Sequence, residues 1–177
     1  ILFKNGITYT ERILIRDRKA EICGDHTSMN LVIEDDVKNI DSDLFLMTHT
    51  TNPFLSENSI KAAISELSSS LAKGEADSLF TVNRVQERFY RKDASPINHD
   101  PNNLIRSQDL EPWFEENSNL YIFNKESFSR TKARIGLNPI MYETEPYESI
   151  DIDTPADWDL GEVLIDYYKK KGIKVDL

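Results

Sequence analysis

The sequence has few of the residues that build cross-links, metal clusters and basic surfaces. Its one cysteine, Cys23, rules out an internal disulfide bond, and no cysteine and histidine residues have the spacing of a zinc site. Acidic residues outnumber lysine and arginine by 31 to 21, and this balance argues against binding to nucleic acid. A run of about 18 apolar residues and a charged-then-apolar leader are both missing, so we expect a cytoplasmic protein that does not bind membranes.

What remains is the composition of a globular protein. With 177 residues, 39% of them hydrophobic, the chain is long enough for one substantial core, and its length favours one domain over residues 1–177. The chain begins with Ile1, and residues 2–9 are typical of the end of a helix followed by a strand at Ile7 to Tyr9. We therefore expect a single domain that is incomplete at its N-terminus.

Strand-like and helix-like segments alternate along the chain. The run 43–48 (DLFLMT) is almost wholly apolar and is typical of a strand buried on both faces. Further strands are predicted at 77–85 and 119–123, and helices at 27–39, 56–74, 125–132 and 157–171. This alternation predicts an α/β fold, a three-layer α/β/α sandwich with a mainly parallel, Rossmann-like sheet, interrupted by an irregular or hairpin insertion at 88–103.

The segment 148–162 (ESIDIDTPADWDLGE) contains the strongest candidate for chemistry. If it begins as a strand, Ile150 and Ile152 enter the core while Asp151 and Asp153 point out together. Two carboxylates at the end of a strand suit Mg²⁺, which prefers one or two carboxylates together with water and phosphate oxygens. The same alternation is also ordinary in an edge strand with a solvated face, and the pattern alone slightly favours that interpretation.

The acidic pair runs into a helix that has a strong start signal. Thr154, Pro155 and Asp157 are typical of an N-cap, a first helical residue and a capping-box partner. The polar turn 49–54 (HTTNPF) directly follows the apolar run 43–48. Because ligands of open α/β sheets bind beyond the carboxyl ends of the strands, we expect this turn and the acidic pair to share one crevice.

Four blocks, in this order, resemble the acylneuraminate cytidylyltransferases, which make CMP-activated sialic acids and related sugars. They are DLFLMTHTTNPFLSENSIKAAI (43–64), ADSLFTVNRV (76–85), RSQDLEPWFEENSNLYIF (106–123) and ESIDIDTPADWDLGE (148–162). They resemble the family's buried strand with its Q-P-T-S-P-L-R-like turn, its next strand, its R-x-Q-D-x-P block with E-N-G-A-I-Y-I, and its S-I-D-I-D-T block. The family's N-terminal strand and its A-R-x-x-S-K-like loop have no counterpart here.

The resemblance implies an activity and a set of roles. The activity is magnesium-dependent transfer of CMP from CTP to an acidic sugar, such as sialic acid, Kdo or a related nonulosonic acid, with release of pyrophosphate. Asp151 and Asp153 would hold the Mg²⁺ that bridges the CTP phosphates and the sugar hydroxyl. Arg106 and Gln108 would fix the acidic sugar or a phosphate, with Arg106 in the catalytic set. The resemblance also implies a homodimer, with a dimerisation insertion at about 88–105.

Other positions carry weaker expectations. The further residues expected to bind substrate are His49, Thr50, Thr51, Asn52, Asn117 and Asn119. His49 stands where the family has glutamine, and Asn119 is bulkier than its counterpart, so the sugar is expected to differ from sialic acid itself. The turn residues are also those that any turn uses.

Several alternatives remain open from the sequence. Arg106 also suits a surface ion pair with Asp109, and Trp113 and Phe114 suit a substrate wall, a dimer contact or the core. For the whole chain, the alternatives are a noncatalytic module that binds a nucleotide or sugar, and a regulatory domain whose aspartates accept a phosphoryl group.

Overall fold

The computed structural model describes Thr10 and residues 13–172 and divides the chain into two compact units, Ile1–Asp41 and Ser42–Leu177. In the first unit the short 3₁₀ helix η2 (Ala20–Ile22) precedes α1 (Met29–Asn39), which Ser28 caps. The helix expected at 27–39 is therefore confirmed, whereas the strand expected at Ile7 to Tyr9 lies outside the described residues. Among the described residues, none of the helices combines the length and the apolar character needed to cross a membrane.

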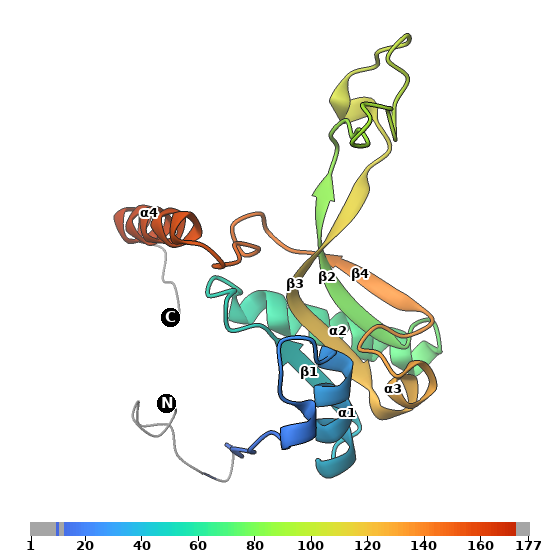
Figure 1. Ribbon diagram of the computed structural model, residues 1–177, viewed down its shortest axis with the longest axis vertical. Coiled ribbons are helices and arrows are strands. Elements are labelled where there is room, and N and C mark those ends of the chain that lie inside the picture. The colour runs from blue at the N-terminus through green and yellow to red at the C-terminus, as the bar shows by residue number, and fades with distance from the viewer. Residues whose placement is uncertain (1–9, 11–12, 173–177) are drawn as a thin grey trace. The chain divides into compact units, whose positions relative to one another are not determined.

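The second unit contains a four-stranded sheet with the order β1-β3-β2-β4 (Figure 1). Its strands are β1 (Leu44–Thr48), β2 (Ser78–Val85), β3 (Trp113–Asn124) and β4 (Pro139–Glu143). Strand β3 pairs antiparallel with both β1 and β2, and β2 pairs parallel with β4. The α/β class is confirmed, but the prediction of a mainly parallel sheet was wrong because β3 lies between β1 and β2 and runs against both.

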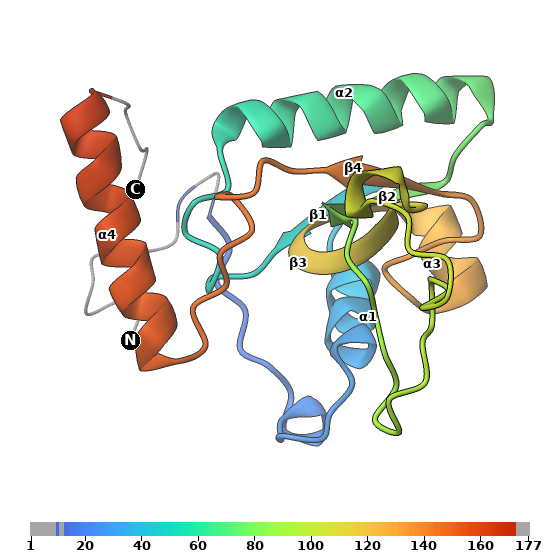
Figure 2. The ribbon, with the colours of Figure 1, turned by 90° about the horizontal axis from the view of Figure 1, so that it is seen from above.

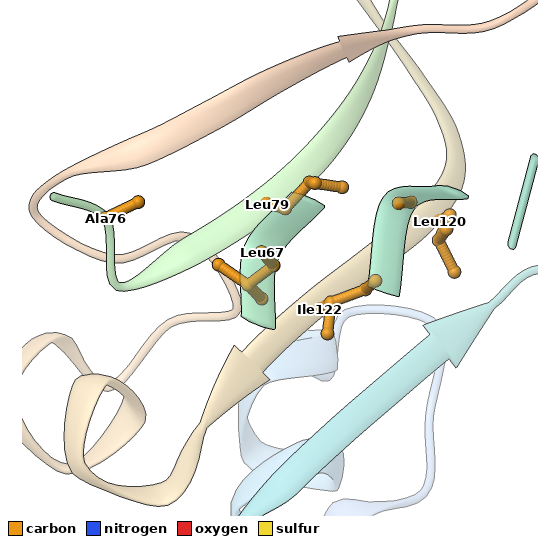
Figure 3. Packing of buried hydrophobic residues seen from close by; sticks show 6 residues of the cluster. Leu67, Ala76, Leu79, Leu120 and Ile122 are labelled. Atoms are coloured by element: carbon orange, nitrogen blue, oxygen red, sulfur yellow. The ribbon is translucent and has the colours of Figure 1, made fainter. Parts of the chain in front are cut away.

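Helices α2 (Glu57–Lys73) and α3 (Lys125–Thr131) cover opposite faces of this sheet (Figure 2). The predicted bounds of α2 are confirmed, because Ser56 accepts a hydrogen bond from the Ser59 N–H at 3.1 Å and Gly74 ends the helix with φ of 71°. A cluster of buried side chains joins α2 to β2 and β3 (Figure 3). Its members are Ala63, Leu67, Ala76, Leu79, Leu120 and Ile122.

The expectation that β1 is buried on both faces was wrong. Leu44 and Leu46 are 36% and 43% exposed, because β1 is an edge strand of the described sheet and α2 contacts β2 and β3 instead. On the opposite face, Phe45 stacks on Phe123 with 5.8 Å between ring centroids, and Phe123 packs on Phe128 of α3. An apolar run therefore identified the strand but not its burial.

Between β2 and β3, residues 86–112 extend away from the sheet as an arm (Figure 1). The arm has little regular structure, with one isolated bridge between Tyr90 and Pro96 and the short 3₁₀ helix η3 (Ser107–Asp109). At its base Phe89 stacks on Trp113 with 5.2 Å between centroids, while Trp113 remains 38% exposed and so is not a core residue. The expected irregular insertion is present, and its role in dimerisation stays a prediction.

The loop 132–138 between α3 and β4 is held by side chains at the start of β2. The carboxylate of Asp77 accepts hydrogen bonds from the N–H groups of Leu137 and Asn138 at 2.9 and 3.1 Å. The hydroxyl of Ser78 accepts from the Gly136 N–H at 2.8 Å. These bonds satisfy backbone donors of the loop and fix it to the start of β2.

Asp77 also makes stability depend on pH. Burial opposes its ionisation, but the N–H groups of Leu137 and Asn138, the Ser78 hydroxyl and Arg130 outweigh burial and hold the pKa of Asp77 below its ordinary value. Such a carboxylate stabilises the fold above its unfolded pKa of about 3.9, and this stabilisation is lost as pH falls through the folded pKa. We expect the free energy of unfolding to decrease below about pH 4 and to decrease less in Asp77→Asn. Urea unfolding of both proteins between pH 7 and 3 measures how steeply the free energy of unfolding changes with pH. Equal slopes for wild type and Asp77→Asn would contradict this role of Asp77.

Candidate functional site

The turn after β1 and the acidic segment lie side by side in the second unit. The backbone N–H of Ile152 donates to the carbonyl oxygen of Thr51 at 2.9 Å, although the two residues are far apart in the sequence. This bond places Asn52, which follows Thr51, close to Asp151, which precedes Ile152. The two segments that the sequence predicted to share a crevice are thus in direct contact.

Residues 150–153 do not form the strand that the alternation predicted. The chain turns at residues 146–149 after β4 and passes beyond the sheet, where no neighbouring strand can pair with it. Asp151 is half-buried, whereas Asp153 is exposed, so burial does not follow the strict alternation of a strand. The prediction of a strand was wrong because spacing alone does not supply a partner for the ladder.

Helix α4 (Pro155–Lys171) starts with the predicted capping box. The Thr154 hydroxyl accepts from the Asp157 N–H at 3.3 Å, and the Asp157 carboxylate accepts from the Thr154 N–H at 2.8 Å. The Asp157 carboxylate also accepts from the Asp153 N–H at 3.2 Å. Hydrogen bonds from Thr154 and Asp153 lower the pKa of Asp157, so the carboxylate stays ionised as this cap requires.

Buried polar atoms without a hydrogen-bond partner gather in this region. Both amide atoms of Asn52, which is 6% exposed, lack a partner within the described part of the chain. The same holds for Oδ1 of Asp151 and Oδ1 of the fully buried Asn119. Buried polar groups are normally paired, and an unpaired one costs about 1–3 kcal/mol, so these three side chains are the candidates for contact with a ligand.

Glu148 fixes the start of the acidic segment. Its carboxylate is only 4% exposed and accepts from the Ser56 N–H at 3.0 Å and the Ser59 hydroxyl at 2.8 Å. This negative charge lies at the N-terminus of α2, where the helix dipole favours it. The side-chain amide of Asn119 donates to the Glu148 carbonyl oxygen at 2.9 Å, so Asn119 also positions this segment.

The other residues expected to bind substrate have different surroundings. His49 begins the turn after β1 and is half-buried, and Thr50 is exposed beside it. Asn117 is buried and donates to Asn83 at 3.0 Å and to Thr144 at 2.8 Å. Asn117 therefore ties β3 to β2 and to the end of β4.

The structure does not bring Arg106 and Gln108 to Asp151. Arg106 makes a bidentate ion pair with Asp109 at 2.7 and 2.9 Å, as the surface interpretation of this arginine predicts. The backbone carbonyl of Gln108 accepts from Gln86 at 3.2 Å. Both residues lie in the arm, which leads away from the sheet (Figure 1). Arg106, at the N-cap of η3, thus pairs with Asp109 three residues later, and this contact engages the guanidinium that the motif assigned to substrate.

The structure adds a cluster that the sequence did not indicate. The guanidinium of Arg134 lies over the Tyr121 ring, 3.7 Å from its centroid, and its Nη2 is 3.3 Å from Glu116. The Tyr121 hydroxyl donates to Glu116. Burial raises the pKa of Tyr121 to about 12, and Glu116 contributes to the rise, so this hydroxyl keeps its proton. Arg134 lies in the loop 132–138, where no periodic pattern marks it.

Asp151 and Asp153 supply carboxylates of the kind that Mg²⁺ uses. Within residues 13–172, no three of the histidine, cysteine and acidic side chains come together as a closed metal cage. Asp151 offers a buried oxygen without a partner, and the exposed carboxylate of Asp153 accepts no hydrogen bond from the described residues. Mg²⁺ commonly takes one or two carboxylates and fills its other positions with water and substrate phosphate oxygens.

Of the comparisons with known proteins, the one with solved structures bears on the fold. No family model and no curated protein matches the chain. Among solved structures, the chain is similar to the 4-diphosphocytidyl-2C-methyl-D-erythritol synthase from Anaerococcus prevotii, with 15% sequence identity and a TM-score of 0.52. The match covers 79% of this chain and 67% of that one. At this identity the likeness establishes a shared fold alone, and membership of the acylneuraminate cytidylyltransferases stays a prediction.

Proposed function

We propose that the protein is a magnesium-dependent cytidylyltransferase that transfers CMP from CTP to an acidic sugar, such as sialic acid, Kdo or a related nonulosonic acid, and releases pyrophosphate. The observation that carries this proposal is the bond between Thr51 and Ile152, because it gathers the unpaired groups of Asn52 and Asp151 beyond β1. The likeness to a synthase named for a diphosphocytidyl compound supports CTP as the nucleotide.

Several of the candidate site residues would have a role in this reaction. Asp151 and Asp153 would hold Mg²⁺, which would neutralise the phosphates of CTP and lower the pKa of the attacking sugar hydroxyl. That hydroxyl oxygen forms a bond to the α-phosphorus as the bond to the bridging oxygen of pyrophosphate breaks. Asn52 offers a donor and an acceptor to the bound substrates, and Thr50 and Thr51 offer hydroxyl groups. The arm is proposed to contact a second copy in a homodimer.

The direct test is release of pyrophosphate by the full-length protein. We expect release only when CTP, Mg²⁺ and an acidic sugar are all present, and loss of release on addition of EDTA. ATP, GTP and UTP, and neutral hexoses, serve as controls for the two substrates. Binding of CTP or sugar without any release across the panel would overturn the proposal in favour of a noncatalytic binding module.

A further inference from the structure

Arg134 is held in place by bonds that reach the loop from two sides. Asp77 and Ser78 bind the backbone of residues 136–138, as described above, and the Ala133 N–H donates to the Thr131 hydroxyl at 3.2 Å. The side chain of Arg134 is 20% exposed, so it is mostly covered but still reachable from solvent. A long, flexible side chain is thus fixed before any ligand arrives, which lowers the entropy that binding would cost.

The guanidinium of Arg134 has donors that the described residues do not satisfy with oxygen. Glu116 takes one of its five N–H groups, at Nη2. The neighbours of Nη1 are Sδ of Met47 at 3.9 Å and Nε2 of His49 at 3.4 Å, a weak acceptor and a ring nitrogen. The Nε–H has no acceptor within the described residues. An anionic ligand group can therefore bind donors that the protein has positioned but not used.

The location of Arg134 connects it to the site proposed above. His49, which Arg134 contacts, begins the turn that contains Asn52 and bonds to Ile152 through Thr51. Asp151, Asp153 and Glu116 contribute carboxylates to these segments. A carboxylate of a substrate entering this region needs a local cation, and Arg106 lies in the arm.

We propose that Arg134 binds the carboxylate of the acidic sugar, an inference that rests on the proposed function. The ring of Tyr121 fixes the plane of the guanidinium, and Glu116 holds one side of it. The remaining donors then meet the two oxygens of a carboxylate, the group whose geometry a guanidinium matches best. His49, which contacts Arg134, would lie next to the carboxylate of the sugar.

The test compares an acid with its ester. N-acetylneuraminic acid, Kdo and their methyl esters are titrated into the full-length protein by calorimetry, and CTP with Mg²⁺ is titrated separately. We expect Arg134→Gln to weaken acid binding about 10- to 100-fold, as for loss of a hydrogen-bonded charge pair, and to leave ester and CTP binding unchanged. Arg134→Lys should keep part of the preference for the acid, and Arg84→Gln, which removes an exposed arginine of β2, should keep all of it.

Three results would overturn the assignment. The first is an unchanged preference for the acid over the ester in Arg134→Gln. The second is a loss of CTP binding in place of acid binding, which would assign Arg134 to a phosphate. The third is a wild-type protein that binds neither acid. Pyrophosphate release by the wild-type protein separates the two proposals. If wild type releases pyrophosphate but Arg134→Gln keeps the preference for the acid over the ester, only the role of Arg134 is refuted. If Arg134 is needed for acid binding but wild type releases no pyrophosphate, only the reaction is refuted.

Discussion

Replacing Asp151 with asparagine is expected to lower the rate of CMP transfer about 1,000-fold, which corresponds to about 4 kcal/mol of lost transition-state stabilisation. The substitution removes a negative charge that would hold Mg²⁺ but preserves the shape of the side chain. The same change should leave the free energy of unfolding within about 1 kcal/mol of wild type or raise it, because Oδ1 of Asp151 is buried without a partner. Pyrophosphate release and urea unfolding of one preparation measure both quantities.

A lower rate of CMP transfer without a loss of stability identifies a functional carboxylate. Asp166→Asn, which removes an exposed carboxylate of α4, is the matched control and should change neither the rate nor the stability. A large loss of stability in Asp151→Asn, with activity falling only in proportion to the folded fraction, would assign Asp151 to the fold instead of the site.

Replacing Gly136 with alanine is expected to destabilise the second unit by about 3 kcal/mol or more. A Cβ atom at this position would lie under 3.0 Å from Oδ1 of Asp77 and Oγ of Ser127, closer than real Cβ atoms approach. Relieving the overlap would displace the Asp77 carboxylate from the N–H groups of Leu137 and Asn138, so overpacking and lost hydrogen bonds add together. For a chain of this size, thermal unfolding should shift down by about 10 °C.

Gly161→Ala is the control for this substitution. The added Cβ would meet Ile152 and Phe54 at ordinary contact distances of 3.5 to 3.7 Å, and Gly161 lies within α4, where alanine is the better helix former. We expect this variant to unfold within about 1 kcal/mol of wild type. Equal melting temperatures for Gly136→Ala and Gly161→Ala would show that the loop 132–138 moves aside without cost.

The sequence predicted most elements of the second unit because their signals are local. Ser56 and Gly74 bound α2, and Thr154 and Asp157 start α4, through hydrogen bonds between residues a few positions apart. The direction of β3 leaves no such local signal, since a strand alternates in the same way whether its neighbours run with it or against it. The sequence therefore predicted β1, β2 and part of β3, but it missed β4, placed a strand at 150–153 that does not form, and gave the wrong orientation to β3.

The same difference between local and long-range signals applies to the site residues. Asp151 and Asn52 were identified because each lies in a recognisable local segment, and the chain order suggested that the segments meet. Arg134 was missed because Asp77, more than fifty residues earlier in the chain, determines where its loop lies. Arg106 was assigned to the substrate from its motif, but the contact with Asp109 three residues later was equally available from the sequence.

Residues 149–153 connect two fixed points, the buried carboxylate of Glu148 and the capping box of α4. Such a segment has few conformations left to lose when a cation binds to it. If the segment holds Mg²⁺ as proposed, its affinity for the ion should depend on anchors that never touch the ion, because freeing either end restores the conformations that binding must remove. Loss of the capping box at Thr154 would then weaken Mg²⁺ binding by entropy alone, with both carboxylates still in place.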